Sequence, residues 1–204
     1  MAAFQSDTDL LRAEIAAAAA RMIAEDGCDY HTAKRKAAKQ ILGERRTSSD
    51  ALPDNAQVEE EVRAYNQLFY GDTQPARLLH LRKLALKLME ELAQFKPHLT
   101  GAVLNGTAGE HSDIHLQLFS DSTKEVEIYL INRNISFETS ESLHFNNRNR
   151  LVETVSFMWQ NEGIHLALYE IDDMRGAFKT GAEKRSERAD ADAVRQLISE
   201  ETTS

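Results

Sequence analysis

The chain contains a single cysteine, Cys28, among its 204 residues. One cysteine excludes an intramolecular disulfide framework and any zinc or iron–sulfur site that needs several cysteines. No apolar run approaches the ~20 residues that span a bilayer, and the segment Met1–Leu10 carries Asp7 and Asp9 where a signal peptide would carry basic residues. We therefore expect a soluble, cytoplasmic protein with no membrane partner.

Basic residues are fewer than acidic residues. The sequence has 24 lysines and arginines against 33 aspartates and glutamates, a formal net charge of −9. This balance opposes non-specific attraction to nucleic acid. Hydrophobic residues make up 42% and charged residues 28%, values that are ordinary for a globular protein. The length suits one domain or two small ones.

The first half of the chain predicts helices. In each of its periodic segments the apolar residues recur at helical spacing, and glycines follow the first three segments as stop signals. The expected helices are Asp9–Glu25, His31–Leu42, a segment capped by Asp54 or Asn55 that runs to Tyr70, and Pro75–Phe95. The segment Glu44–Asn55 has no periodicity, which indicates a loop.

After Pro97 the pattern becomes strand-like. We expect a buried strand over Leu99–Asn105 and an alternating strand over Ile114–Phe119, then a helix that Ser122 and Glu125 open as a capping box. Further strands are expected at Ile135–Thr139, Leu151–Trp159 and Ile164–Ile171, the last two as an antiparallel hairpin around Asn161-Glu162-Gly163. The pattern predicts an α+β fold, with a helical region at 1–97 packed on a small mixed β-sheet at 98–175, and a polar tail with a short helix at 176–204.

The stretch from Gly101 to Phe119 carries the candidate chemistry. Gly106 permits a close backbone approach to phosphate, and Thr107 adds a hydroxyl and an N–H group at the same turn. Asp113 and His115 are two residues apart at the start of the next strand, so their side chains project from the same face. This combination is typical of a phosphate-binding turn beside a pair of metal ligands.

These residues resemble the nucleotidyltransferase superfamily of the DNA polymerase beta type, particularly its small stand-alone members. The resemblance covers roughly residues 99–170. Val103-Leu104 is similar to the first strand of the family signature, Gly106-Thr107 to its Gly-Ser pair, and Ser112-Asp113-Ile114-His115-Leu116 to its Ser-Asp-Ile-Asp-Leu. The order of the following helix and strands, ending in Ile164-His165-Leu166, also agrees with the family.

Two histidines replace carboxylates of that signature. His115 stands at the place of the second metal-binding aspartate and His165 at the place of the third carboxylate. Neutral imidazole is a poor ligand for magnesium and a suitable one for manganese or zinc. Three readings follow: an altered enzyme in which Asp113, His115 and His165 hold a transition metal, a fold that has lost catalysis and binds a nucleotide or a protein, and a coincidental motif.

The resemblance implies a nucleotidyltransferase-like protein that moves a nucleoside monophosphate from a nucleoside triphosphate to a small molecule, a protein or RNA. Asp113, His115 and His165 are then the catalytic residues and the ligands of a divalent metal, namely magnesium, manganese or zinc, and Gly106, Thr107 and Ser112 bind the nucleotide. The alternative is a non-catalytic nucleotide-binding or protein-interaction module. Carboxylates contributed to the site by Glu153, Glu170 or Asp172 would favour catalysis, whereas their absence would favour binding. Strand parity leaves the face of His165 open, because hairpin register decides it.

Overall fold

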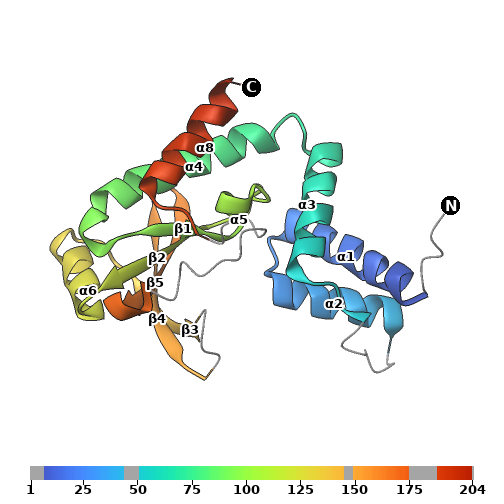
Figure 1. Ribbon diagram of the computed structural model, residues 1–204, viewed down its shortest axis with the longest axis horizontal. Helices are drawn as coiled ribbons and strands as arrows, with labels where there is room; N and C mark the ends of the chain where they lie inside the picture. Colours follow the sequence, from blue (N-terminus) through green and yellow to red (C-terminus); the bar gives the residue numbers. More distant parts are fainter. Residues whose placement is uncertain (1–6, 44–50, 145–148, 175–187, 204) are drawn as a thin grey trace. The chain divides into compact units, whose positions relative to one another are not determined.

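The computed structural model describes residues 7–43, 51–144, 149–174 and 188–203, and Figure 1 shows their arrangement along the chain. The helices of the first half are α1 (Asp7–Asp26), α2 (Tyr30–Leu42), α3 (Asn55–Phe69) and α4 (Gln74–Glu91), followed by a short 3-10 helix at Ala93–Phe95. The remaining elements are β1 (His98–Thr100), α5 (Gly101–Asn105), β2 (Ile114–Ser120), α6 (Thr123–Asn132), β3 (Glu138–Leu143), β4 (Leu151–Trp159), β5 (Glu162–Glu170), a 3-10 helix at Ile171–Asp173, and α8 (Ala191–Thr203). The α+β class is confirmed.

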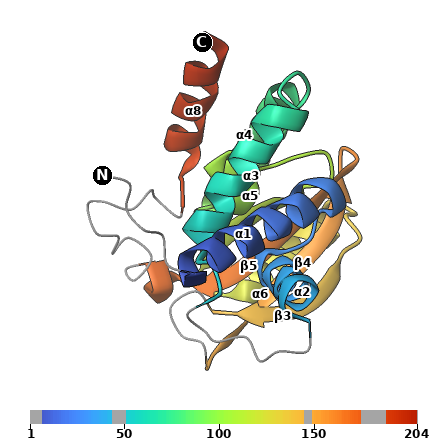
Figure 2. The same cartoon turned by 90° about the vertical axis from the view of Figure 1, so that its right-hand side faces the viewer.

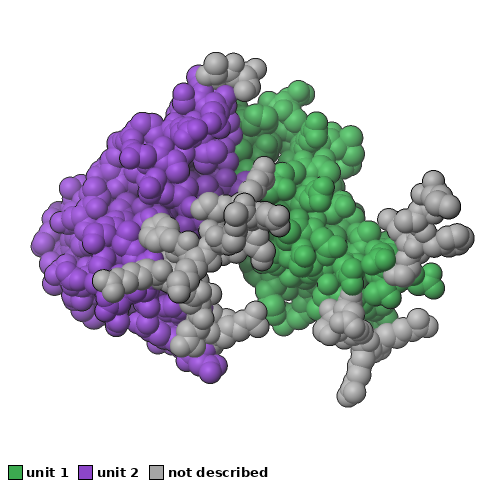
Figure 3. Space-filling model, viewed as in Figure 1, with its two compact units in different colours: residues 1–78, 106–111 green, residues 79–105, 112–204 purple. Residues whose placement is uncertain are grey.

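The chain forms two compact units, shown in different colours in Figure 3. Unit 1 contains residues 1–78 and 106–111, and unit 2 contains residues 79–105 and 112–204. Most of α4 therefore belongs with the sheet, whereas the boundary expected at residue 97 groups it with the first three helices. The short segment 106–111, which lies between α5 and β2 in the sequence, belongs with the helices of unit 1.

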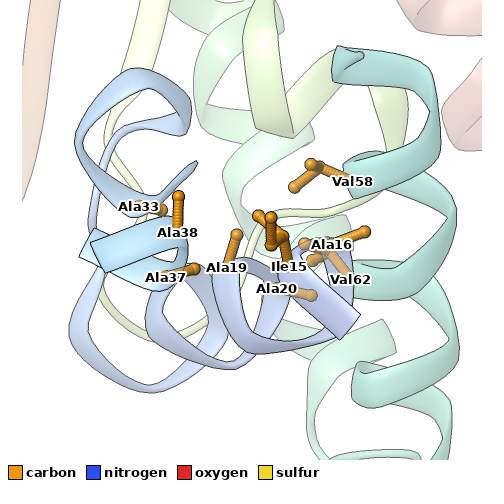
Figure 4. Close-up of a cluster of buried hydrophobic side chains, with 9 residues drawn as sticks. All are labelled: Ile15, Ala16, Ala19, Ala20, Ala33, Ala37, Ala38, Val58 and Val62. Atoms are coloured by element: carbon orange, nitrogen blue, oxygen red, sulfur yellow. The ribbon is translucent and has the colours of Figure 1, made fainter. Parts of the chain in front are cut away.

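Unit 1 is held together by small side chains. Ile15 and three alanines of α1 are buried against alanines of α2 and the valines Val58 and Val62 of α3 (Figure 4). Alanine lets helices approach closely, so the alanine-rich run that follows Ile15 serves as a packing surface. Asp29 accepts a hydrogen bond from the Thr32 N–H at the start of α2. Asp54 caps α3, one of the two residues expected from the sequence, and it forms a reciprocal capping box with Gln57.

Unit 2 is built on one mixed five-stranded sheet of order β1-β2-β5-β4-β3. β2 and β5 are parallel, and the other neighbouring pairs are antiparallel. The predicted hairpin of β4 and β5 is confirmed, with Trp159 paired to Glu162. Gln160 and Asn161 form the turn with φ values of 52° and 67°, a two-residue turn of the I′ kind that suits twisted strands.

The strand predicted at Leu99–Asn105 is wrong over most of its length. Only His98–Thr100 pairs with β2, and Gly101–Asn105 forms the short helix α5. Gly101 has φ +71°, a left-handed conformation that interrupts an extended strand. The buried Arg82 side chain of α4 then donates hydrogen bonds to the carbonyls of Val103 and Leu104, each at 2.9 Å, and these bonds satisfy carbonyls that a helix end leaves without a partner.

The end of α6 displaces another predicted strand. Asn134 adopts a left-handed conformation with φ 55°, and the Ile135 N–H donates to the Leu130 carbonyl at 3.0 Å. This pattern is a Schellman-type helix cap, so Ile135 belongs to the helix end and β3 begins only at Glu138. The expected capping box at the other end of α6 is also wrong, because the Ser122 side chain makes no capping bond.

The C-terminal helix α8 runs beside α4 in both views of the chain (Figures 1 and 2). Arg195 of α8 forms an ion pair with Glu90 of α4 at 2.9 Å, and Glu201 pairs with the buried Arg82. Ala189, just before this helix, forms an antiparallel bridge with Leu99 of β1. The short helix predicted near the C-terminus is therefore present and continues to Thr203.

Candidate functional site

A row of polar residues crosses one face of the sheet. Directly paired residues of neighbouring strands share a face, and the register pairs Thr100 with His115, His115 with His165, His165 with Ser156, and Ser156 with Glu138. The apolar side chains that alternate with this row on the central strands are buried on the other face, among them Ile114, Leu116, Ile164, Leu166, Val155 and Phe157. The sheet thus has one packed apolar face and one face with a polar row.

His165 is the centre of this row. Its Nε2 lies 3.0 Å from Asp113 Oδ2, and its Nδ1 lies 2.8 Å from Ser156 Oγ. Strand parity left the face of His165 open, and the parallel register of β2 and β5 places it with Asp113. The Asp113 and His165 side chains keep 46% and 31% of their surface exposed, so a ligand can reach this pair from solvent.

His115 stacks on His165. The two rings are nearly parallel, with centroids 4.7 Å apart and 17° between their planes. Burial of the ring and the adjacent His165 lower the pKa of His115 to about 4, while Asp113 acts in the opposite direction. His115 is therefore uncharged at neutral pH.

Gly163 makes the contact between Asp113 and the sheet possible. A Cβ atom built at Gly163 would lie 2.3 Å from Asp113 Oδ1 and 2.6 Å from its Cγ. Both distances are far shorter than any van der Waals contact, so any side chain at position 163 would displace the Asp113 carboxylate. Glycine at this position of β5 reserves the space in which Asp113 reaches His165.

The expected set of three metal ligands is only partly assembled. Asp113 and His165 are adjacent, whereas His115 contacts His165 through the face of its ring. Among the described residues, no group of three histidine, cysteine, aspartate or glutamate side chains is arranged to hold a metal ion. Asp113 and His165 contact each other directly, and whether the pair binds a metal stays a prediction.

The carboxylates that would favour catalysis lie elsewhere. Glu153 faces Lys124 and Glu127 of α6, and Glu170 pairs with Arg150. Glu153 is an odd number of residues from Ser156 in β4, and Glu170 is an odd number of residues from His165 in β5. Their side chains therefore project from the opposite face of the sheet. Asp172 lies in the 3-10 helix that follows the C-terminal end of β5. Asp113 lies beside Gly163, near the N-terminal end of the same strand. By the criterion set out from the sequence, their positions favour binding over two-metal catalysis.

The turn at Gly106 and Thr107 lies in unit 1, whereas Asp113, His115 and His165 belong to unit 2. Gly106 has φ 86°, in agreement with a turn that requires glycine. Thr107 is only 2% exposed, and its Oγ1 lies 3.2 Å from the Tyr30 hydroxyl. The Thr107 hydroxyl therefore has a structural contact, and its phosphate-binding role stays a prediction, as does that of Ser112, which links this turn to Asp113.

Two important residues of the site have no motif in the sequence. Ser156 stands in the middle of a β-strand, and only the register of β4 against β5 brings it to His165. Gly163 was interpreted as part of a turn, although it pairs with Met158 inside the hairpin. One signal could have identified it, because a glycine inside a strand often marks a close approach of another group.

Comparisons with known proteins give little beyond this geometry. No family model and no curated protein matches the chain. One solved structure that matches is described as "structure of GLD-2/RNP-8 complex", with 19% identity and a TM-score of 0.32 over 57% of this chain and 48% of that one. The chain thus spans about half the length of that structure's chain, and a likeness at this level supports no functional argument. Among the described residues, no helix is both long and apolar enough to cross a membrane.

Proposed function

We propose that the Asp113–His165 pair binds a divalent metal together with the phosphates of a nucleoside triphosphate. The positions of Glu153 and Glu170 favour binding without catalysis. The second candidate function is transfer of the nucleoside monophosphate to an acceptor, with release of pyrophosphate. The acceptor class is a small molecule, a protein or RNA. The observation that carries the proposal is the 3.0 Å separation of Asp113 Oδ2 and His165 Nε2 on an accessible sheet face.

This separation suits two ligands of one ion. Two atoms bound at right angles to a metal at about 2.1 Å lie roughly 3.0 Å apart. Metals of this class commonly take one or two protein ligands and fill the remaining positions with water and substrate phosphates. Because one of the two ligands is an imidazole, we expect manganese or zinc to bind more tightly than magnesium.

The charge of Asp113 also favours a bound cation beside a phosphate ligand at this site. Asp113 contributes a negative charge, and the neutral His115 contributes no positive charge to offset it. An anionic triphosphate next to Asp113 would be repelled. A bound divalent ion supplies the charge that brings the phosphates and the carboxylate together.

Ser156 would orient the metal ligand. A neutral histidine that binds a metal through Nε2 carries its proton on Nδ1, and that N–H would donate to Ser156 Oγ, 2.8 Å away. Hydrogen bonds of this kind fix the tautomer and the ring orientation of metal-binding histidines. Ser156 is thus a positioning residue in this proposal, and it does not contact the nucleotide.

The test measures binding and transfer separately. The purified protein is titrated with nucleoside triphosphates in the presence of magnesium, manganese or zinc, and α-labelled triphosphates are then followed for transfer of label to protein, RNA or small molecules. Asp113→Asn and His165→Gln should weaken metal–nucleotide binding about 100-fold or more, since each removes one of two protein ligands. Asp72→Asn and His31→Gln, at exposed positions outside the polar row, are the matched controls.

Each outcome has a defined meaning. Metal-dependent binding with label transfer supports the second candidate function, nucleotidyl transfer. Binding that depends on Asp113 without any transfer supports the non-catalytic alternative, which the positions of Glu153 and Glu170 favour. Binding by Asp113→Asn as tight as that of the unmodified protein would contradict the site assignment.

A further inference from the structure

Ser156, His165 and Asp113 form a continuous chain of hydrogen bonds across the sheet. Ser156 Oγ of β4 lies 2.8 Å from His165 Nδ1 of β5, and His165 Nε2 lies 3.0 Å from Oδ2 of Asp113, which directly precedes β2. All three residues belong to unit 2. A serine, a histidine and an aspartate linked in this order are the groups that activate a serine as a nucleophile.

The Asp113 carboxylate decides in which direction these hydrogen bonds run when no metal is bound. An ionised carboxylate only accepts hydrogen bonds, so the single proton of a neutral His165 ring has to lie on Nε2. Nδ1 then carries a lone pair, and the Ser156 hydroxyl donates to it. A general base needs this arrangement, because its lone pair must face the proton that it takes.

The His165 ring is reversed relative to the usual serine hydrolase, in which Nε2 faces the serine and Nδ1 faces the aspartate. Either nitrogen of an imidazole can carry the proton or the lone pair. The reversed ring therefore performs the same proton transfer. His115 stacks on this ring, with 17° between the two planes, and so supports its orientation.

The surroundings of Ser156 favour a particular class of substrate. Glu138, which is exposed, is paired with Ser156 across β3 and β4, and together with Asp113 it disfavours an anionic substrate. Met158 projects from the same face as Ser156 and is 68% exposed, so it offers an apolar surface to a neutral substrate. Because Ser156 pairs with strands on both sides, the backbone N–H groups beside it serve the sheet, and the reaction depends on a good leaving group.

We propose that Ser156 is a nucleophile that attacks neutral carboxylic esters of phenols, with His165 as its general base. Ser156 Oγ forms a bond to the carbonyl carbon while its proton passes to His165 Nδ1. The bond from that carbon to the phenol oxygen then breaks, and the departing oxygen takes the proton from Nδ1. Water attacks the acyl-serine in the same way, which releases the carboxylic acid and restores Ser156.

Asp113 is a positioning residue in this reaction, because it holds the ring in the form with the proton on Nε2. The activity is independent of the proposed function, since a metal bound to Nε2 would require the proton on Nδ1.

The first test locates the acyl group. The full chain is incubated with p-nitrophenyl acetate in the presence of EDTA, and the acetylated peptides are identified by mass spectrometry. We expect acetyl-Ser156, which Ser156→Ala should lose and which should form about 100-fold more slowly in His165→Gln, the effect of losing a general base. Ser140→Ala, at an exposed position of β3, is the matched control.

The second test is the NMR spectrum of the His165 ring nitrogens, again with EDTA. The unmodified protein should show a protonated Nε2 and an unprotonated Nδ1. The amide of Asp113→Asn can donate to Nε2, so this variant should populate the form with the proton on Nδ1 and acetylate Ser156 about tenfold more slowly or less. Asp72→Asn should leave both the spectrum and the rate unchanged.

Acetyl groups on lysines with none on Ser156 would overturn the inference. So would a His165 ring that carries its proton on Nδ1 in the unmodified protein, or acetylation of Ser156 in His165→Gln at the unmodified rate. Failure of the protein to bind metal and nucleotide would refute the proposed function alone, since both tests here are made without either ligand.

Discussion

Replacing Gly163 by alanine adds one methyl group at the point where Asp113 meets the sheet. The new Cβ would lie 2.3 Å from Asp113 Oδ1, 2.6 Å from Cγ and 3.0 Å from Oδ2. The strand backbone of β5 is well suited to alanine, so the side chain of Asp113 has to move. It is half exposed and can rotate into solvent, which separates it from His165.

The expected cost in stability is small. Asp113 loses a partly exposed hydrogen bond to His165, worth about 1 kcal/mol. Alanine in a strand regains about 0.5–1 kcal/mol relative to glycine, because the unfolded chain has less conformational freedom. The two effects nearly cancel, so the free energy of unfolding should change by less than about 1 kcal/mol.

The expected cost in binding is large. Asp113 is one of two proposed protein ligands, and moving it away should weaken metal–nucleotide binding about 100-fold, which corresponds to about 2.7 kcal/mol. Titration calorimetry measures this loss, and urea unfolding measures stability on the same sample. Gly109→Ala is the matched control, since its added Cβ would meet its nearest neighbour, the Ala24 carbonyl, at an ordinary 3.9 Å.

A double-mutant cycle identifies the cause. In the Asp113→Ala background the methyl group at position 163 has no carboxylate to displace, so Gly163→Ala should have no further effect on binding. Gly163→Ala that binds metal–nucleotide as tightly as the unmodified protein would refute the reasoning. An equal loss of binding in both backgrounds would assign the effect of the alanine to the strand and not to Asp113.

Three further changes test other parts of the structure. Ser156→Ala should weaken metal binding about tenfold through the lost bond to the site histidine, measured by calorimetry against Ser140→Ala, an exposed serine of β3. Ile15→Ala should lower the free energy of unfolding by about 3 kcal/mol, because Ile15 is fully buried, whereas Leu10→Ala, at a position that is 50% exposed, should cost far less in the same urea titration. Burial lowers the pKa of His98 below 6.5, so the unfolded chain takes up this proton first and the free energy of unfolding should fall as the pH drops from 7 to 5. His98→Gln should make the free energy of unfolding less dependent on pH in this range, and an unchanged dependence would contradict the role of His98.

Local sequence signals determined the longer helices of this protein. Asp54 and Gln57 specify the start of α3 because their side chains satisfy N–H groups that a helix start leaves open. The run Leu151–Trp159 predicted β4 with its observed bounds. These elements follow from interactions within a few residues of sequence, and a sequence pattern records such interactions directly.

Elements that depend on distant partners were not predictable in the same way. Gly101–Asn105 reads as a strand, yet the carbonyls of Val103 and Leu104 bond to Arg82, about twenty positions earlier in the sequence. The apolar content of that segment is equally compatible with a buried strand and a buried helix. The presence of Arg82 beside it, which only the fold supplies, decides between the two.

The site residues likewise fall into some that the sequence predicted and others that only the strand register brought together. The sequence placed Asp113 and His115 on one face, because residues two apart in a strand must share it. Register alone decided that His165 and Ser156 join them. A shift of one residue between β2 and β5 would turn His165 away from Asp113, and a shift of one residue between β4 and β5 would turn Ser156 away from His165. The alternation within each strand is thus a property of the sequence, whereas the alignment between strands is set by the packing of the whole sheet and by the space that Gly163 leaves for Asp113.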